Sequence, residues 1–111
     1  MKLLLIAPLA DGQSTGESWI AFQWIRLLSE HHEVTVLSYR PRTGRPLGPQ
    51  LPGVRVVEWA EPPLLGAHER FAAMLKPGNP VFRWRAHEWI NRALAAGERF
   101  DIAHQLAPVS L

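Results

Sequence analysis

The chain has 111 residues, of which 47% are hydrophobic and 20% are charged, so one domain with a real core is expected, and a two-domain enzyme is excluded. Twelve Lys and Arg residues against ten Asp and Glu residues leave a formal charge of +2 without a dense basic run, which gives no support to nucleic-acid binding. The absence of cysteine excludes disulfides, thiol catalysis and Cys-ligated zinc.

The first forty residues predict a strand, a helix and a second strand. Residues 2–9 form an apolar run that is typical of a buried parallel strand; the run is too short to cross a bilayer and lacks the cleavage pattern of a signal peptide. Ser14 and Glu17 fit a capping box, so a helix should begin at about Ser14 or Thr15. Helical spacing predicts that its core-facing residues are Ile20, Trp24, Leu27 and Leu28. Residues 33–39 are rich in β-branched side chains and predict the second strand.

The rest of the chain predicts two more strands and two more helices. Residues 40–53 are rich in Pro and Gly, which indicates an exposed loop, and residues 54–59 predict a third strand. A helical stretch is expected over 65–76 and a clearer helix over 81–96, which Gly97 should end. For the helix over 81–96, the apolar spacing predicts a buried face made of Phe82, Ala86, Trp89, Ile90, Ala93 and Leu94. Residues 100–106 predict the fourth strand.

This alternation predicts an α/β fold with a Rossmann-like parallel sheet, flanked by helices, in the spatial order 3-2-1-4. Such a sheet binds ligands beyond the carboxyl ends of strands 1 and 4, where the strand order reverses. Residues 10–16 and the residues from His104 onward are therefore the places where a site is expected.

The loop after the first strand could approach a phosphate group through Gly12, Ser14, Thr15 and Gly16. Its spacing matches neither the dinucleotide motif nor the P-loop, and the neighbouring Asp11 and Glu17 would oppose an anion. A capped turn without any ligand explains the same residues equally well.

The second candidate is His104, which could hydrogen-bond a phosphate or a sugar hydroxyl, or exchange a proton. The alternative is a partly buried histidine that only packs. The five histidines show no metal-ligand spacing, so no metal site is expected.

The five tryptophans are expected mainly in the core, with Trp19 as the exception because it lies near the Gly16 loop. Arg40, Arg42 and Arg45 could meet an anionic lipid or an acidic acceptor, or simply be solvated.

Two other classes of protein share this kind of α/β start. A dinucleotide-dependent oxidoreductase needs an acidic residue at the end of the second strand, where this chain has Ser38, Tyr39 and Arg40. A small binding module of the flavodoxin or receiver type needs either a richer phosphate loop than Ser14 and Thr15 or an acidic cluster around Asp11. The oxidoreductase is disfavoured, because the chain also lacks the dinucleotide motif, and the non-enzymatic binding module is the first alternative.

The order of the motifs resembles glycosyltransferase family 4. Residues 1–8 (MKLLLIAP) resemble the opening strand of that family, residues 32–37 (HEVTVL) its second strand, and residues 100–104 (FDIAH) its fourth. The resemblance covers nearly the whole chain. The family loop commonly has paired glycines, whereas this chain has only Gly16, between Thr15 and Glu17.

The resemblance implies that residues 1–111 are a partial N-terminal, acceptor-side domain of a GT-B enzyme, without the C-terminal nucleotide-binding domain. Such an enzyme transfers a sugar from a nucleotide-sugar donor to a saccharide or lipid-linked acceptor with retention, and it needs no metal and no separate cofactor. By the resemblance, His104 would be catalytic beside the sugar, Gly12, Ser14, Thr15 and Gly16 would belong to the donor-phosphate loop, and Trp19 would lie on the acceptor side.

A cytoplasmic location is expected, and the lipid-linked acceptors of many such enzymes allow peripheral contact with a membrane. The small net charge predicts no nucleic-acid partner. The 111 residues alone are expected to be inactive. Because the fourth strand is the last one expected, it should leave an exposed sheet edge that favours self-association.

Overall fold

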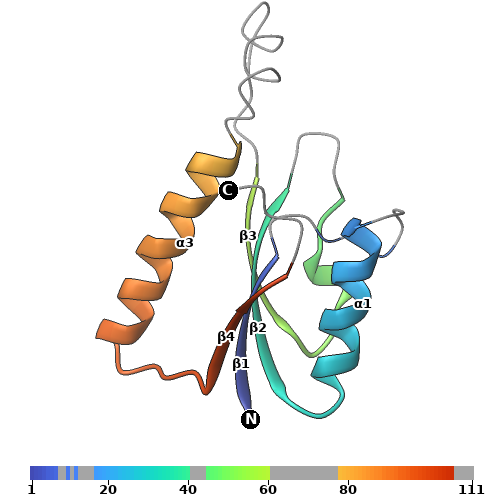
Figure 1. The fold of residues 1–111 in the computed structure, drawn as a ribbon, viewed down its shortest axis with the longest axis horizontal. Coiled ribbons are helices and arrows are strands. Elements are labelled where there is room, and N and C mark those ends of the chain that lie inside the picture. The colour runs from blue at the N-terminus through green and yellow to red at the C-terminus, as the bar shows by residue number, and fades with distance from the viewer. Residues whose placement is uncertain (8–9, 11, 13–16, 41–44, 61–77, 107–111) are drawn as a thin grey trace, which may run out of the picture.

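The computed structural model describes residues 1–7, 10, 12, 17–40, 45–60 and 78–106, and these residues form a sheet between two layers of helix (Figure 1). In chain order the elements are β1 (Lys2–Ala7), α1 (Glu17–Ser29), β2 (Glu33–Arg40), the 3-10 helix η1 (Gly48–Gln50), β3 (Arg55–Ala60), α3 (Gly78–Ala95) and β4 (Ile102–Gln105). The predicted strands are all present. The ends of β2, β3 and β4 lie within two residues of the predicted ends, and residues 8 and 9 of the first predicted strand lie outside the described residues. The helical stretch expected over 65–76 lies outside the described residues.

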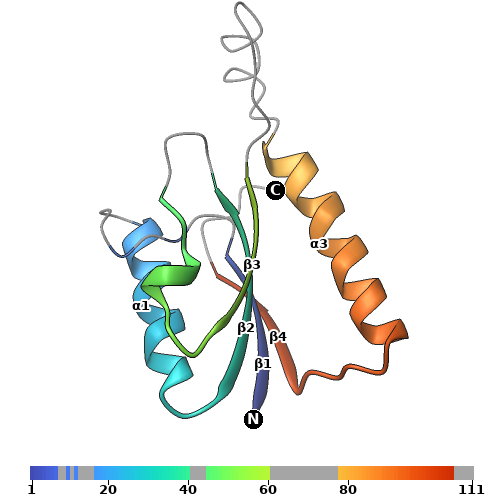
Figure 2. The same cartoon turned by 180° about the vertical axis from the view of Figure 1, so that it is seen from behind.

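The four strands form one parallel sheet in the order β3-β2-β1-β4, which confirms the predicted Rossmann-like order. The views from the two sides show α1 and η1 on one face and α3 on the other (Figures 1 and 2). The reversal of strand order therefore falls between β1 and β4, where Leu5 pairs with His104 and Ile6 with Gln105.

The α1 face of the sheet is the larger apolar layer. Alternate residues of β1 supply Leu3, Leu5 and Ala7 to it, because successive strand side chains point to opposite faces. Helix α1 adds its own buried row to this layer: Ala21, Phe22 and Ile25.

The predicted core face of α1 is wrong for three of its four residues. Ile20, Trp24 and Leu27 are about half exposed, and only Leu28 packs against the core. Apolar residues cover more than half of the circumference of this helix, so the period of 3.6 allows two choices of buried face. The position of the helix on the sheet selects the face that carries Ile25.

The α3 face is built on Leu4 and Leu37, with Phe82 and Ala86 from the helix. Ala93 is also buried and Trp89 and Ile90 are partly buried, as predicted, whereas Leu94 is 41% exposed and was wrongly expected inside. Gly97 ends the helix with a φ of +93°, and the N–H groups of Gly97 and Glu98 donate to the carbonyls of Leu94 and Ala93. This Schellman arrangement confirms the predicted stop.

The segment predicted as an exposed loop after β2 is in part a core element. Its described residues contain η1, and the leucines that flank this short helix, Leu47 and Leu51, are 0% and 3% exposed. The backbone N–H of Leu47 donates to Oε2 of Glu58 at 3.1 Å, which ties the segment to β3. The density of Pro and Gly indicated turns correctly, but it concealed two leucines that the sheet buries.

Ion pairs join the amino ends of β1 and β3 to the segment before β4. The Glu98 carboxylate accepts from the Arg55 guanidinium and lies 3.5 Å from Lys2 Nζ. The hydrogen bond from Arg55 lowers the pKa of Glu98 below its ordinary value of 4.5, against a smaller opposing effect of desolvation, and the positive charges of Arg55 and Lys2 add to the lowering.

We therefore expect the Glu98→Gln variant to lose stability near neutral pH but not in acid. A carboxyl with a lowered folded-state pKa stabilises the fold above its unfolded pKa, and this contribution is lost as the pH falls through the folded value. The difference in Tm between the two proteins should thus shrink as the pH drops below 4.5. Thermal melts across that range check this, with Glu30→Gln at the exposed end of α1 as the control; a Tm difference independent of pH would contradict it.

Candidate functional site

The candidate site lies where β1 and β4 run side by side. The chain leaves β1 at Ala7 and reaches Gly12 before α1, and β4 places His104 opposite Leu5. A backbone hydrogen bond of 2.9 Å from Leu106 N–H to the Ile6 carbonyl continues this pairing past the end of β4. Of the predicted site residues, Gly12, Trp19 and His104 are described, and Ser14, Thr15 and Gly16 lie outside the described residues.

Gly12 makes close contacts within the fold, and one of them explains why this residue is a glycine. A Cβ atom at this position would lie 2.6 Å from Cε1 of Phe22, whose ring is buried. The Gly12 N–H donates to Oε1 of Gln50 at 2.9 Å, and Nε2 of Gln50 in turn donates to the Pro46 carbonyl at 2.8 Å. In this arrangement the Gly12 amide is already engaged, and Gly12 is tied to Gln50 of η1.

Replacing Gly12 with alanine should therefore lower the free energy of unfolding by about 1–3 kcal/mol, the usual cost of overpacking a filled site. Urea denaturation followed by circular dichroism measures this. Gly48→Ala is the matched control, because no atom lies within 4 Å of a Cβ built there. Equal stability of the Gly12→Ala and Gly48→Ala proteins would count against the close contact with Phe22.

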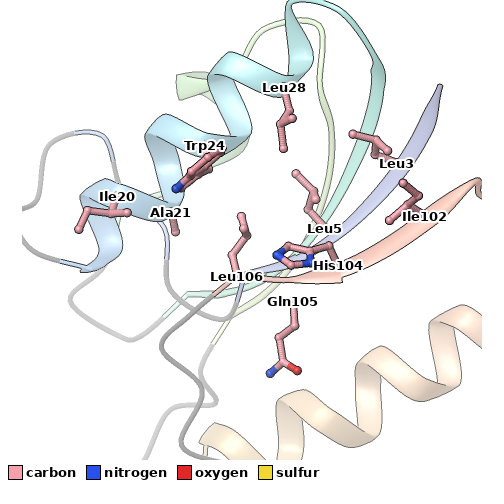
Figure 3. Close-up of a pocket in the computed structure, with 10 residues that line it drawn as sticks. All are labelled: Leu3, Leu5, Ile20, Ala21, Trp24, Leu28, Ile102, His104, Gln105 and Leu106. Carbon is pink, nitrogen blue, oxygen red and sulfur yellow. The ribbon is translucent and has the colours of Figure 1, made fainter.

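His104 is exposed, and its side chain lies on the α1 face of the sheet. The alternative of a partly buried packing histidine is therefore not what the structure has. Figure 3 shows the ring directed to the α1 side of β4, while the next residue, Gln105, is directed to the α3 side. An exposed imidazole at the reversal of strand order is free to meet a ligand.

His104 lines a groove of about 500 Å³ between α1 and the β1–β4 part of the sheet (Figure 3). Eight of its ten lining residues are apolar, and none is Asp, Glu, Lys or Arg. The floor comes from β1 and from the β4 segment, and α1 forms one wall; the complete lining is Leu3, Leu5, Ile20, Ala21, Trp24, Leu28, Ile102, His104, Gln105 and Leu106. The sequence pattern contained the wall residues Ile20, Trp24 and Leu28, but it assigned them to the core, so the groove was missed.

The tryptophans do not follow the expected division between core and site. Trp59 and Trp89 are partly buried, and they pack against Phe82 and Phe100 with ring centroids 6.0 and 6.2 Å apart. Three others are exposed, which contradicts a core position for two of them: Trp19 at 44%, Trp24 at 54% and Trp84 at 60%. Trp19 is in the first turn of α1, and its acceptor-side role stays a prediction.

The charged residues near the end of β2 are partly neutralised. Arg40 Nη1 lies 3.7 Å from Oε1 of Glu58, and Arg45 is exposed. Arg42 lies outside the described residues. Within the described part of the chain, His, Asp and Glu side chains form no group of three that could hold a metal ion, and the helices there are too short or too polar to cross a membrane.

No family model, no curated protein and no solved structure matches this chain. The resemblance to glycosyltransferase family 4 therefore rests on the sequence motifs alone.

Proposed function

We propose that this chain is the acceptor-side part of a glycosyltransferase that uses a nucleotide-sugar donor. The observation that carries the proposal is the exposed His104 on β4, beside β1, at the reversal of a 3-2-1-4 parallel sheet. This is the position at which open α/β sheets take their ligands. Two of the sequence motifs that resemble family 4, residues 1–8 and 100–104, fall on these two strands.

The strand order favours this proposal over a flavodoxin-like or receiver-like module. In those folds the third strand pairs with the first, giving the order 2-1-3-4-5, whereas β3 of this chain pairs with β2. The end of β2 also disfavours a dinucleotide oxidoreductase. The carboxylate closest in register is Glu58, opposite Ser38, and it already accepts from Leu47 and pairs with Arg40.

In the proposed reaction the acceptor hydroxyl oxygen bonds to the anomeric carbon of the donor sugar. The bond from that carbon to the diphosphate oxygen breaks, and the hydroxyl proton passes to the leaving diphosphate. His104 would hydrogen-bond the sugar beside the reacting carbon and hold it in place. Because Gly12 N–H is engaged by Gln50, the phosphate contacts would fall to Ser14, Thr15 and Gly16. A second domain would hold the nucleotide, and the acceptor would be a saccharide or a lipid-linked sugar.

The chain is expected to bind nucleotide-diphosphate sugars weakly through this site. A titration followed by two-dimensional NMR should move the amide signals of Gly12, His104 and Gln105. His104→Ala should weaken binding about 10- to 100-fold, the equivalent of one hydrogen bond to a charged or strongly polar partner. His87→Ala is the matched control, because His87 is also exposed but lies on α3, on the opposite face of the sheet.

Three other results would change this proposal. Equal binding by the His104→Ala and His87→Ala proteins would remove His104 from the site. Saturable binding of a flavin nucleotide or of NAD(P)H, with no response to nucleotide sugars, would replace the transferase with one of the two alternatives. Sugar transfer by the 111-residue chain alone would overturn the expectation that it is inactive.

A further inference from the structure

Helix α1 has two apolar faces, and its own sheet covers only one of them. The covered face carries Ala21, Phe22 and Ile25. The second face carries Ile20, Trp24 and Leu27, at spacings of four and three residues, and these side chains are 50%, 54% and 49% exposed. A row of three large apolar side chains at helical spacing is the pattern of a helix that packs on both sides.

The neighbouring strand β4 is open as well. It is an edge of the described sheet, its four residues are exposed, and Ile102 is 49% exposed. The groove floored by β1 and β4 lies directly beside the uncovered face of α1, and Ile20 and Trp24 belong to both (Figure 3). The helix and the groove together form one continuous apolar surface, which we call the α1–β4 surface.

We propose that the α1–β4 surface is the interface of a two-fold symmetric dimer, in which the uncovered face of α1 of each copy lies in the groove of the other. A two-fold interface requires one patch that is complementary to itself. This surface meets that condition because the same helix supplies the ridge, through Ile20 and Leu27, and the wall of the groove, through Ile20 and Trp24. A second copy can therefore supply both the ridge and the groove that the contact needs.

The size and charge of the surface agree with this occupant. The exposed halves of Ile20, Trp24, Leu27 and Ile102 amount to roughly 400 Å² of apolar area on each copy. A standard interface buries about 800 Å² on each partner, of which about 56–65% is apolar, so these four residues supply most of that share. No Asp, Glu, Lys or Arg side chain lines the groove, so the contact buries no unpaired side chain of these four types.

The dimer does not rest on the proposed transferase function. His104 lies in the lining of the groove, so the dimer covers it and competes with a ligand for the same place. The mass of the particle is a readout that needs no sugar, and it separates failure of the dimer from failure of the transferase proposal.

Sedimentation velocity of the 111-residue chain from about 1 to 200 μM tests the proposal, since interfaces of standard size have micromolar or tighter dissociation constants. We expect a monomer–dimer equilibrium without larger species, and Ile20→Glu and Trp24→Glu should each raise its Kd at least 10-fold. Trp84→Glu is the matched control, because this tryptophan is 60% exposed but lies on α3. Circular dichroism shows whether each variant is folded, and the substituted side chains are half exposed, so the fold should be retained.

Three results would overturn the dimer. One is a monomer over the whole concentration range, which would point to a different partner for the surface. Another is a dimer whose Kd responds to none of the α1 substitutions, as pairing between the edges of β4 would give. The third is equal weakening by Trp84→Glu, which would show unspecific association of exposed aromatic residues.

Discussion

Replacing Leu47 with alanine is expected to lower the free energy of unfolding by about 2–5 kcal/mol, because its side chain is completely buried and its loss leaves a cavity. Leu47 belongs to the cluster on the α1 face, together with Leu3 and Leu5 of the sheet. The segment around η1 is thus a part of the core and not a loop that can be shortened without cost.

Equilibrium unfolding in urea measures this loss, and Leu94→Ala is the matched control. Leu94 is the same residue type and was expected in the core, but it is 41% exposed. Its truncation should therefore lower the free energy of unfolding much less than that of Leu47 does. If both substitutions had the same effect, η1 would not be docked on the sheet in solution.

The second large effect is expected within α1, where Ile25→Ala should destabilise the fold by about 2–5 kcal/mol and Ile20→Ala should have little effect on the isolated subunit. The two residues are identical in type and share one helix, but Ile25 is 0% exposed and Ile20 is 50% exposed. The comparison therefore measures burial alone, with helix propensity held constant.

Urea unfolding at a protein concentration well below the dissociation constant of the proposed dimer keeps the comparison free of self-association. A larger loss from Ile20→Ala than from Ile25→Ala would mean that the helix presents to the sheet the face predicted from its sequence. At a high protein concentration the loss of stability from Ile20→Ala should be larger, because Ile20 would then also stabilise the dimer through its interface.

The uncovered face of α1 belongs both to the candidate site and to the proposed dimer interface. Ile20 and Trp24 form one wall of the groove that contains His104, so the same surface is available to a ligand or to a second copy. If both proposals hold, a nucleotide sugar should shift the equilibrium toward the monomer, since a ligand stabilises the state that it binds.

The candidate site could be anticipated only in outline. His104 follows from the fourth-strand motif and from the rule that ligands gather at the reversal of strand order. The groove beside it could not be anticipated, because it exists only where α1 stops short of covering β4. Gly12 shows the same limit: its sequence context suggests a phosphate loop, whereas its contacts with Phe22 and Gln50 give it a structural reason.

The sequence by itself determined the alternation of elements and the parallel order of the sheet. Continuous apolar runs such as residues 3–7 are stable only when both faces of a strand are covered, and Gly97 ends a helix by local backbone geometry. Only the tertiary structure decided which half of α1 is buried, that Leu47 and Leu51 join the core, and that Ile20, Trp24 and Ile102 are left outside. The physical reason is that periodicity and turn chemistry are local properties, whereas burial depends on which surfaces the docked layers leave uncovered.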